Sequence, residues 1–319
     1  MEPLAHPGWC ENLIKASGLK PGEQVLVVVD EPLVAEGAQL ATAMKDAGGK
    51  PRLELWAGER PLQALPPGVA DGARTADVSL FLSQAPRGDE AATRFQLLEA
   101  MAAHGGRQIF MGFVDSDLLR GELSEPFNDF ADAAQQLIAE LAGCDTLRIT
   151  GRAGTDLTLK IAGRPWKTDT GELEPGEAAN FPGGEIFVAP HSDGADGVLV
   201  ADLTVPYTVE GFVDEPVTMR FERGRVTSIE GGRAADLLRE LVDSAGDGGN
   251  VIAEVGIGLN HTVRPRGHVM LDEKAGGTAH VAIGRNTGPY GGNNHATIHV
   301  DCIFSAPELE ADGRPVPIP

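Results

Sequence analysis

Short apolar runs alternate with segments of helical periodicity along the first 144 residues. Residues 24–29 (QVLVVV) form a continuous β-branched run, which is typical of a strand buried in a parallel sheet. Further runs and periodic segments predict strands at 51–56, 78–82 and 108–111 and helices at 33–47, 90–104 and 128–142. This alternation predicts a doubly wound α/β domain over residues 1–144.

The pattern changes near residue 145. Residues 147–163 alternate with period two and contain glycine turns, which predicts a β-hairpin. Later runs predict strands at 184–188, 197–205, 217–221 and 226–229, with one helix at 234–244. Residues 145–319 are therefore expected to form a mainly antiparallel, α+β domain. The first domain has no GxGxxG after its first strand and no P-loop, so we do not expect it to bind a nucleotide.

Composition narrows the classes of protein that this chain can belong to. The net charge of -21 disfavours nucleic acid and anionic membrane as partners. No apolar run is long enough to span a bilayer, and the first residues lack the pattern of a signal peptide. The three cysteines are widely scattered and predict neither disulfides nor a zinc finger. We therefore expect a cytoplasmic, reduced protein.

The segment 251–304 carries the strongest candidate chemistry. His299 and Asp301 are two residues apart in a β-rich run, so their side chains are expected on one face of a strand. Placing both side chains against a core is costly unless a partner compensates them. A divalent cation is a common partner for this pair of ligand types. The segment therefore predicts a metal centre, completed by an earlier carboxylate.

Three further residues are candidate ligands, each with a plainer alternative. Glu185 follows two glycines at the start of a strand, where a solvated edge carboxylate is the alternative. Glu254 lies in an apolar run and is either buried and paired or turned outward. His280 is either a ligand or a hydrogen-bonded core histidine. Four more histidines are treated as groups near the site or on the surface: His191, His261, His268 and His295.

Four motifs in order resemble the metalloaminopeptidases of the aminopeptidase T and aminopeptidase S family. They are N-x-P-G-G-E-[IV]-F-x-A-P, E-x-G-I-G-x-N, D-E-K-x-G-G-T-x-H-x-A-[IL]-G and G-G-x-N-x-x-x-x-H-x-D, all present after residue 179. The resemblance implies two divalent ions (zinc, cobalt or manganese). It implies five metal ligands, which are Glu185, Glu254, His280, His299 and Asp301.

The same resemblance implies an aminopeptidase-like hydrolase that cleaves an N-terminal amino acid or small amide. Glu185 and Glu254 are then candidates for a bridging or general-base role. The family's functional tyrosine would stand at Thr287, and Tyr290 is its nearest candidate replacement. A homodimer acting on a peptide or small molecule is also implied.

A second resemblance leaves an alternative open. The chain length and the G-P-Y-G-G-N-N ending resemble the 2,5-dihydroxypyridine ring-cleaving dioxygenases, which hold one Fe(II) with two histidines and an aspartate. His280, His299 and Asp301 match such a set, whereas a glutamate at position 254 favours the hydrolase. A non-catalytic relative is a third possibility. Lys274 and Arg285 are expected either to stabilise developing negative charge or to lie on the surface.

Overall fold

The computed structural model describes residues 6–84, 90–125, 130–169, 173 and 175–319. By its internal contacts the chain divides into two compact units. The first unit comprises 1–128 and 171–183, and the second comprises 129–170 and 184–319. Each unit is described by itself below.

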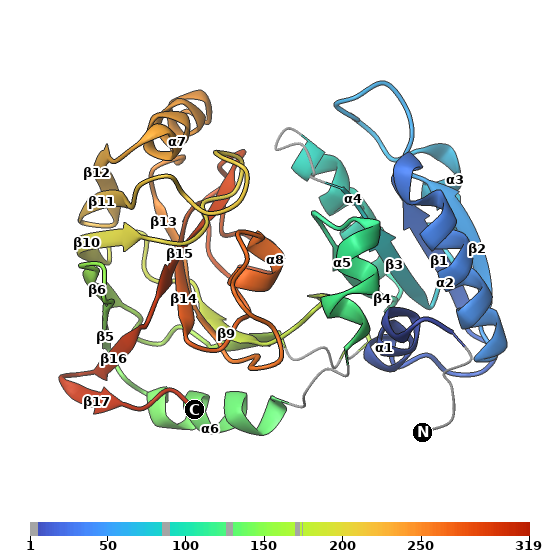
Figure 1. Cartoon of the computed structure of the whole chain (residues 1–319), viewed down its shortest axis with the longest axis horizontal. Helices are drawn as coiled ribbons and strands as arrows, with labels where there is room; N and C mark the ends of the chain where they lie inside the picture. The colour runs from blue at the N-terminus through green and yellow to red at the C-terminus, as the bar shows by residue number, and fades with distance from the viewer. Residues whose placement is uncertain (1–5, 85–89, 126–129, 170–172, 174) are drawn as a thin grey trace. The chain divides into compact units, whose positions relative to one another are not determined.

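The first unit is built around one parallel sheet (Figure 1). Its strands are β1 (Gln24–Val29), β2 (Lys50–Leu55), β3 (Val78–Leu82), β4 (Arg107–Met111) and β8 (Ala178–Asn180), in the order β2-β1-β3-β4-β8. Its helices are α1 (Gly8–Ser17), η1 (Glu31–Leu33), α2 (Val34–Asp46), α3 (Pro67–Ala73), α4 (Ala91–Ala102), α5 (Ser116–Arg120) and η3 (Glu122–Ser124).

Helices cover both faces of this sheet because its strands β1 and β3 are apolar on both sides. Leu26 of β1 belongs to a buried cluster with Val69 of α3 and Leu97 of α4. Val29, which points to the opposite face of the same strand, lies close to Gly37 of α2. The expected doubly wound α/β arrangement is therefore confirmed.

The second unit contains two antiparallel sheets. The seven-stranded sheet has the order β12-β11-β10-β6-β5-β16-β17, with β5 (Thr146–Thr150), β6 (Asp156–Lys160), β10 (Ala195–Ala201), β11 (Val217–Glu222), β12 (Arg225–Glu230), β16 (Glu308–Ala311) and β17 (Arg314–Val316). The five-stranded sheet has the order β15-β14-β13-β9-β7, with β7 (Lys167–Asp169), β9 (Glu185–Val188), β13 (Ile252–Gly258), β14 (Thr278–Gly284) and β15 (His299–Ser305).

The helices of the second unit are α6 (Ala131–Leu141), α7 (Arg233–Ser244), α8 (Val269–Asp272) and η4 (Gly288–Tyr290). The mainly antiparallel character expected for the second half is confirmed. Strands β13 and β14 are buried along their whole length, so any polar side chain on them needs a partner. No described helix is long and apolar enough to cross a membrane.

The division by contacts differs from the boundary expected at 144/145. Helix α6 belongs to the second unit, where it contacts β9, and 171–183 returns to the first unit to supply β8. An independent domain 1–144 followed by 145–319 stays a prediction. The first residues of the helix expected at 128–142, namely 128 and 129, lie outside the described residues.

Candidate metal centre

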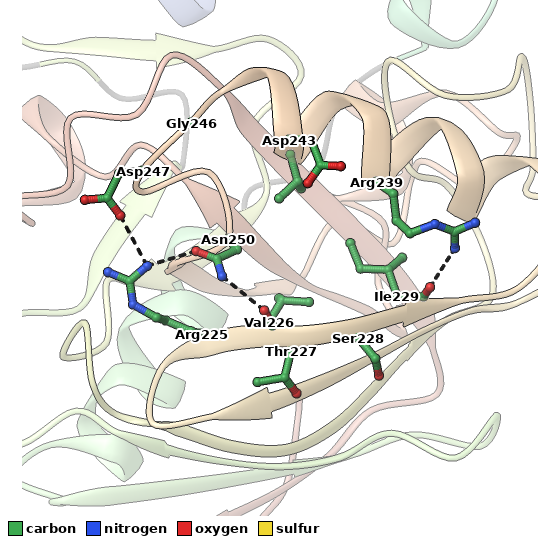
Figure 2. Close-up of a pocket in the computed structure, with 11 residues that line it drawn as sticks. Arg225, Val226, Thr227, Ser228, Ile229, Arg239, Asp243, Gly246, Asp247 and Asn250 are labelled. Carbon is green, nitrogen blue, oxygen red and sulfur yellow. Dashed lines mark hydrogen bonds and ion pairs between the residues drawn. The ribbon is translucent and has the colours of Figure 1, made fainter.

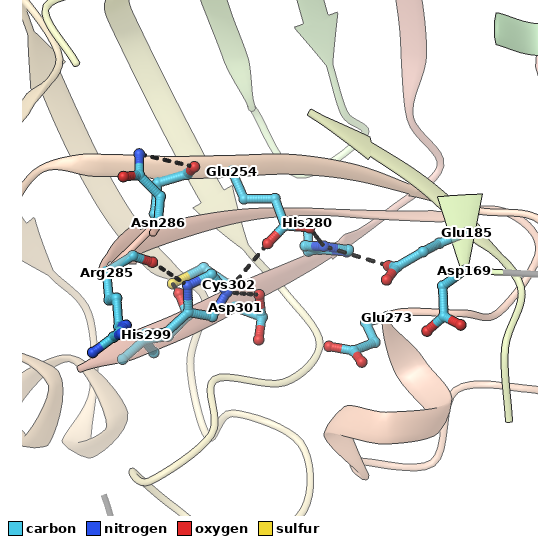
Figure 3. A network of polar contacts seen from close by, with 12 residues as sticks. Asp169, Glu185, Glu254, Glu273, His280, Arg285, Asn286, His299, Asp301 and Cys302 are labelled. Atoms are coloured by element: carbon cyan, nitrogen blue, oxygen red, sulfur yellow. Dashed lines mark hydrogen bonds and ion pairs between the residues drawn. The ribbon is translucent and has the colours of Figure 1, made fainter. Parts of the chain in front are cut away.

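The strand register brings the predicted ligands to one face of the five-stranded sheet. Glu254 in β13 lies opposite Ala282 in β14, which in turn lies opposite Asp301 in β15. Directly opposed residues point to the same face, as do alternate residues of one strand. His280 and His299 therefore share that face with Glu254 and Asp301 (Figure 3).

Two neighbouring strands add carboxylates to this face. Glu185 in β9 lies opposite Gly258 of β13, and Asp169 in β7 lies opposite Glu185. The register between β13 and β14 shifts between Ile252 and Glu254. Glu254 is only 3% exposed, so the alternative in which it faces solvent is excluded.

Small residues make room for the charged side chains. A Cβ atom on Gly256 would lie 2.1 Å from Cε1 of His280, so the imidazole lies directly over the glycine backbone. Ala282 separates Glu254 from Asp301 with a single methyl group. The glycines and alanines of the motifs therefore serve the site by leaving the face of the sheet open.

Glu254 lies between the two histidines. Its Oε1 is 3.5 Å from Nε2 of His280, and its Oε2 is 3.2 Å from Nε2 of His299. Each imidazole also faces a second carboxylate. Nε2 of His280 is 3.6 Å from Oε2 of Glu185, and Nε2 of His299 is 3.2 Å from Oδ1 of Asp301. Each imidazole thus lies between two carboxylates, and Glu254 faces both imidazoles.

These spacings fit divalent ions. Metal–oxygen and metal–nitrogen bonds of about 2.0–2.2 Å place neighbouring tetrahedral donors roughly 3.3 Å apart. Oε2 of Glu185 and Nδ1 of His280 are buried and make no hydrogen bond to a described residue. One donor atom each from Glu254, His280 and Asp301 lies within 4.8 Å of the others. A set of carboxylate and imidazole donors with an unsatisfied buried oxygen suits a cation.

Lys274 lies inside the cluster rather than on the surface. Its side chain is fully buried, and its ammonium contacts Glu185, Glu273 at 3.0 Å and Asp169 at 3.3 Å. Three carboxylates accept from its ammonium, so a surface position is excluded. A role of Lys274 in stabilising developing negative charge stays a prediction.

Burial and mutual attraction shift the titration of the cluster. Burial raises the pKa of Glu185 to about 8, more than the positive charges of Lys274 and His280 lower it. Burial would lower the pKa of His280, but its contacts with Glu254 and Glu185 raise it to about 9. Burial would raise the pKa of Asp301, but the adjacent His299 holds it below its usual range. The cluster therefore strongly favours added positive charge.

Tyr290 lies against the site from η4. Its ring stacks on the imidazole of His299 with centroids 4.6 Å apart and meets the edge of Phe187 at 5.8 Å. Burial keeps the pKa of the Tyr290 hydroxyl above its ordinary value, so the phenol is neutral at pH 7. Nδ1 of His299 is 2.6 Å from the carbonyl oxygen of Arg285, a contact in which this nitrogen is the donor and Nε2 is directed to the carboxylates.

The remaining histidines point elsewhere. Nε2 of His191 lies 2.9 Å from the carbonyl oxygen of Ala162, and Nε2 of His261 lies 3.1 Å from that of Pro319. His295 is exposed, and the backbone amide of His268 donates to the carboxylate of Asp272. Two carboxylates of the cluster, Asp169 and Glu273, were not predicted. Glu273 adjoins Lys274 in the D-E-K motif, whereas Asp169 carries no local signal.

A separate polar cavity of about 500 Å³ lies between β12 and α7 (Figure 2). Arg225 and Arg239 line it, and both are already engaged. Arg225 donates to Asn250, and Arg239 donates to the carbonyl oxygen of Ile229. None of the five predicted metal ligands lines this cavity.

The relatives of known name include aminopeptidases and a 2,5-dihydroxypyridine dioxygenase. Aminopeptidase AmpS of Bacillus subtilis is 29% identical over 182 residues, which cover 50% of this chain and 43% of that protein. Aminopeptidase T of Thermus thermophilus is 28% identical over 50% of this chain and 43% of that protein. The 2,5-dihydroxypyridine 5,6-dioxygenase of Pseudomonas putida is 32% identical over 35% of this chain and 33% of that enzyme. The matches thus span less than half of these relatives.

Solved structures match along the whole chain. The 2,5-dihydroxypyridine dioxygenase of Pseudomonas putida KT2440 superposes with a TM-score of 0.75 and 20% identity, covering 98% of this chain and 96% of that one. Wild-type AmpT from Thermus thermophilus superposes with a TM-score of 0.66 and 19% sequence identity, covering 97% of each chain. Residues 98–317 match the family model described as NicX, 2,5-dihydroxypyridine 5,6-dioxygenase. The chain therefore belongs to the NicX family, and it has aminopeptidases AmpS and T among its relatives.

Proposed function

We propose that this protein is a metal-dependent hydrolase that removes an N-terminal amino acid or cleaves a small amide. The observation that carries the proposal is the position of Glu254, whose two oxygens face the imidazoles of His280 and His299. A carboxylate between two donor sets suits a bridge between two divalent ions. The aminopeptidase relatives support the same reading.

Charge balance also supports two ions. Metal binding requires ionised carboxylates and neutral imidazoles, and in those forms five buried or partly buried carboxylates and one buried ammonium leave four negative charges. Two divalent ions neutralise that charge, whereas one leaves an excess that is costly in a poorly hydrated site. The residues counted are Asp169, Glu185, Glu254, Glu273, Asp301 and Lys274.

Each residue then has a distinct proposed role. Glu185 and His280 would hold one ion, His299 and Asp301 would hold the other, and Glu254 would contribute to both. Zinc, cobalt or manganese bound there would lower the pKa of a water molecule and polarise the substrate carbonyl. Tyr290, a neutral phenol whose ring stacks on His299, would donate a hydrogen bond to developing negative charge.

Hydrolysis of aminoacyl p-nitroanilides and of short peptides tests the proposal. Protein loaded with Zn²⁺, Co²⁺ or Mn²⁺ is expected to release p-nitroaniline, and His299→Ala and Asp301→Ala are expected to abolish the reaction while the fold is retained. His295→Ala, an exposed histidine four residues from His299, is the matched control and should stay active. A fully active Asp301→Ala variant would refute the assignment.

The family match gives a second candidate function, a ring-cleaving dioxygenase. His280, His299 and Asp301 would then hold one Fe(II) as two histidines and one carboxylate. This candidate predicts oxygen uptake with 2,5-dihydroxypyridine by Fe(II)-loaded protein and no release of p-nitroaniline. The extra carboxylates Glu185 and Glu254 favour the hydrolase, and the two assays on one preparation separate the candidates.

A further inference from the structure

The buried ammonium of Lys274 lies next to one donor set of the candidate metal centre. It contacts Glu185, Glu273 and Asp169, and it is 0% exposed. Lysine side chains are rarely fully buried, because a buried ammonium needs strong compensation from negative charge. The three carboxylates supply that compensation, and in return the ammonium relieves their mutual repulsion.

Glu185 connects this ammonium to the metal donors. Its Oε1 accepts a hydrogen bond from Nζ of Lys274, while its Oε2 faces Nε2 of His280 at 3.6 Å. An ion held by Glu185, His280 and Glu254 would therefore lie one carboxylate away from a fixed positive charge. We call this donor set the inner set.

The second donor set differs in its exposure and in having no lysine among its described ion pairs. It consists of Glu254, His299 and Asp301, and we call it the outer set. In the described part of the chain, the ion-pair partner of Asp301 is His299. The side chain of His299 is 19% exposed, compared with 1% for His280. Water therefore screens the outer set better than the inner set.

We propose that the two ion positions are unequal and that Lys274 is the cause. The outer set binds a divalent ion tightly, and the inner set binds one more weakly. Like charges a few ångströms apart in a poorly screened interior repel strongly. The ammonium of Lys274 repels an ion at the inner set, and it stabilises the neighbouring carboxylates when no metal is bound. This inference rests on the proposed two-ion function.

Titration of metal-free protein with Co²⁺ tests the inference, with visible absorption and calorimetry as readouts. The unmodified protein is expected to bind two ions, the second at least about tenfold more weakly than the first. In Lys274→Met the dissociation constant of the second Co²⁺ ion is expected to come within about threefold of that of the first. The melting temperature of the metal-free Lys274→Met protein should fall, and its rise on adding Co²⁺ should increase.

Lys274→Arg is the matched control, because it keeps the charge and should keep the two constants apart. The inference would be overturned if the unmodified protein bound both Co²⁺ ions with equal dissociation constants. It would also be overturned if Lys274→Met failed to bind the second ion. If Lys274→Met does not fold, Glu185→Gln is expected to bind one ion with the first constant unchanged. If Glu185→Gln no longer binds the first ion tightly, the assignment of that ion to the outer set is contradicted. Failure of the unmodified protein to bind any ion would instead overturn the proposed function.

Discussion

Gly256 shows how one residue without a side chain supports the candidate centre. The imidazole of His280 occupies the space where a Cβ atom would lie, so Gly256→Ala must displace that ring. We expect the variant to lose about 1–3 kcal/mol of stability through overpacking. We also expect it to bind less than two Co²⁺ per chain, because His280 no longer faces Glu254. Unchanged metal content in a folded Gly256→Ala protein would contradict this placement.

An ion pair in the first unit gives a pH-dependent prediction away from the metal centre. Burial would raise the pKa of Glu90, but hydrogen bonds from Arg60 and from the backbone amide of Leu62 hold it below its ordinary value. A lowered pKa stabilises the fold above the unfolded pKa of about 4.3, and that contribution is lost as the pH falls through the folded pKa. Glu90→Gln should therefore cost about 1–3 kcal/mol at pH 7.

The cost of Glu90→Gln is expected to shrink as the pH falls below about 4, because the native carboxylate is then protonated too. Denaturant unfolding at several pH values measures the difference. Asp71→Asn is the matched control, since Asp71 and Arg74 form an ion pair in the same unit with both side chains more than half exposed. Its cost should stay below about 0.5 kcal/mol at every pH. A pH-independent cost for Glu90→Gln would argue against the ion pair.

The clustering of the five candidate ligands could be predicted from the sequence, but their neighbours could not. Glu185, Glu254, His280, His299 and Asp301 lie in motifs whose spacing is visible along the chain, and the structure brings all five to one face. Asp169 joins them through strand pairing that no local pattern encodes, and Glu273 joins them from the end of α8, next to Lys274 in the D-E-K motif. The sequence around Lys274 is rich in turn residues, so it did not indicate that this lysine is fully buried.

At the scale of elements, the connection from β14 to β15 carries Tyr290 and is braced by two asparagines. The side-chain amide of Asn294 donates to the carbonyl oxygens of Gly248 and Gly284, and its backbone amide donates to the side chain of Asn286. We expect Asn294→Ala to lose its two side-chain bonds to Gly248 and Gly284 and to release the stack of Tyr290 on His299.

Hydrogen exchange measures this loosening of the connection. Amides of residues 286–294 should exchange at least about tenfold faster in Asn294→Ala, which corresponds to about 1.4 kcal/mol of local stability. His295→Ala, one position further along and exposed, should leave exchange unchanged. Equal exchange in both variants would show that the asparagine does not hold the connection.

Buried apolar strands were the most predictable elements. β1 and β3 have the expected bounds, 24–29 and 78–82, because a run of β-branched and large apolar residues suits a strand buried on both faces. β8 was missed, since a three-residue segment far along the chain pairs with β4 only through tertiary structure. Helices α3 and α5 were missed as well, and both are short.

At the scale of the whole molecule, the charge of -21 is expected to oppose compactness. Screening is weak at about 0.01 M salt and strong above about 0.1 M. The midpoint of thermal unfolding should therefore rise by about 2–4 °C when NaCl is raised from about 0.01 M to 0.3 M. Differential scanning fluorimetry of metal-free protein measures this shift. A midpoint that falls with salt would mean that attractive ion pairs outweigh the net repulsion.

The number of divalent ions per chain tests the central claim most directly. Mass-spectrometric metal analysis of protein saturated with Mn²⁺ or Zn²⁺ and freed of unbound metal gives this number. We predict about two ions per chain, falling to one or fewer in Glu254→Gln because both donor sets lose their shared carboxylate. One ion per chain in the unmodified protein, retained in Glu254→Gln, would contradict the account.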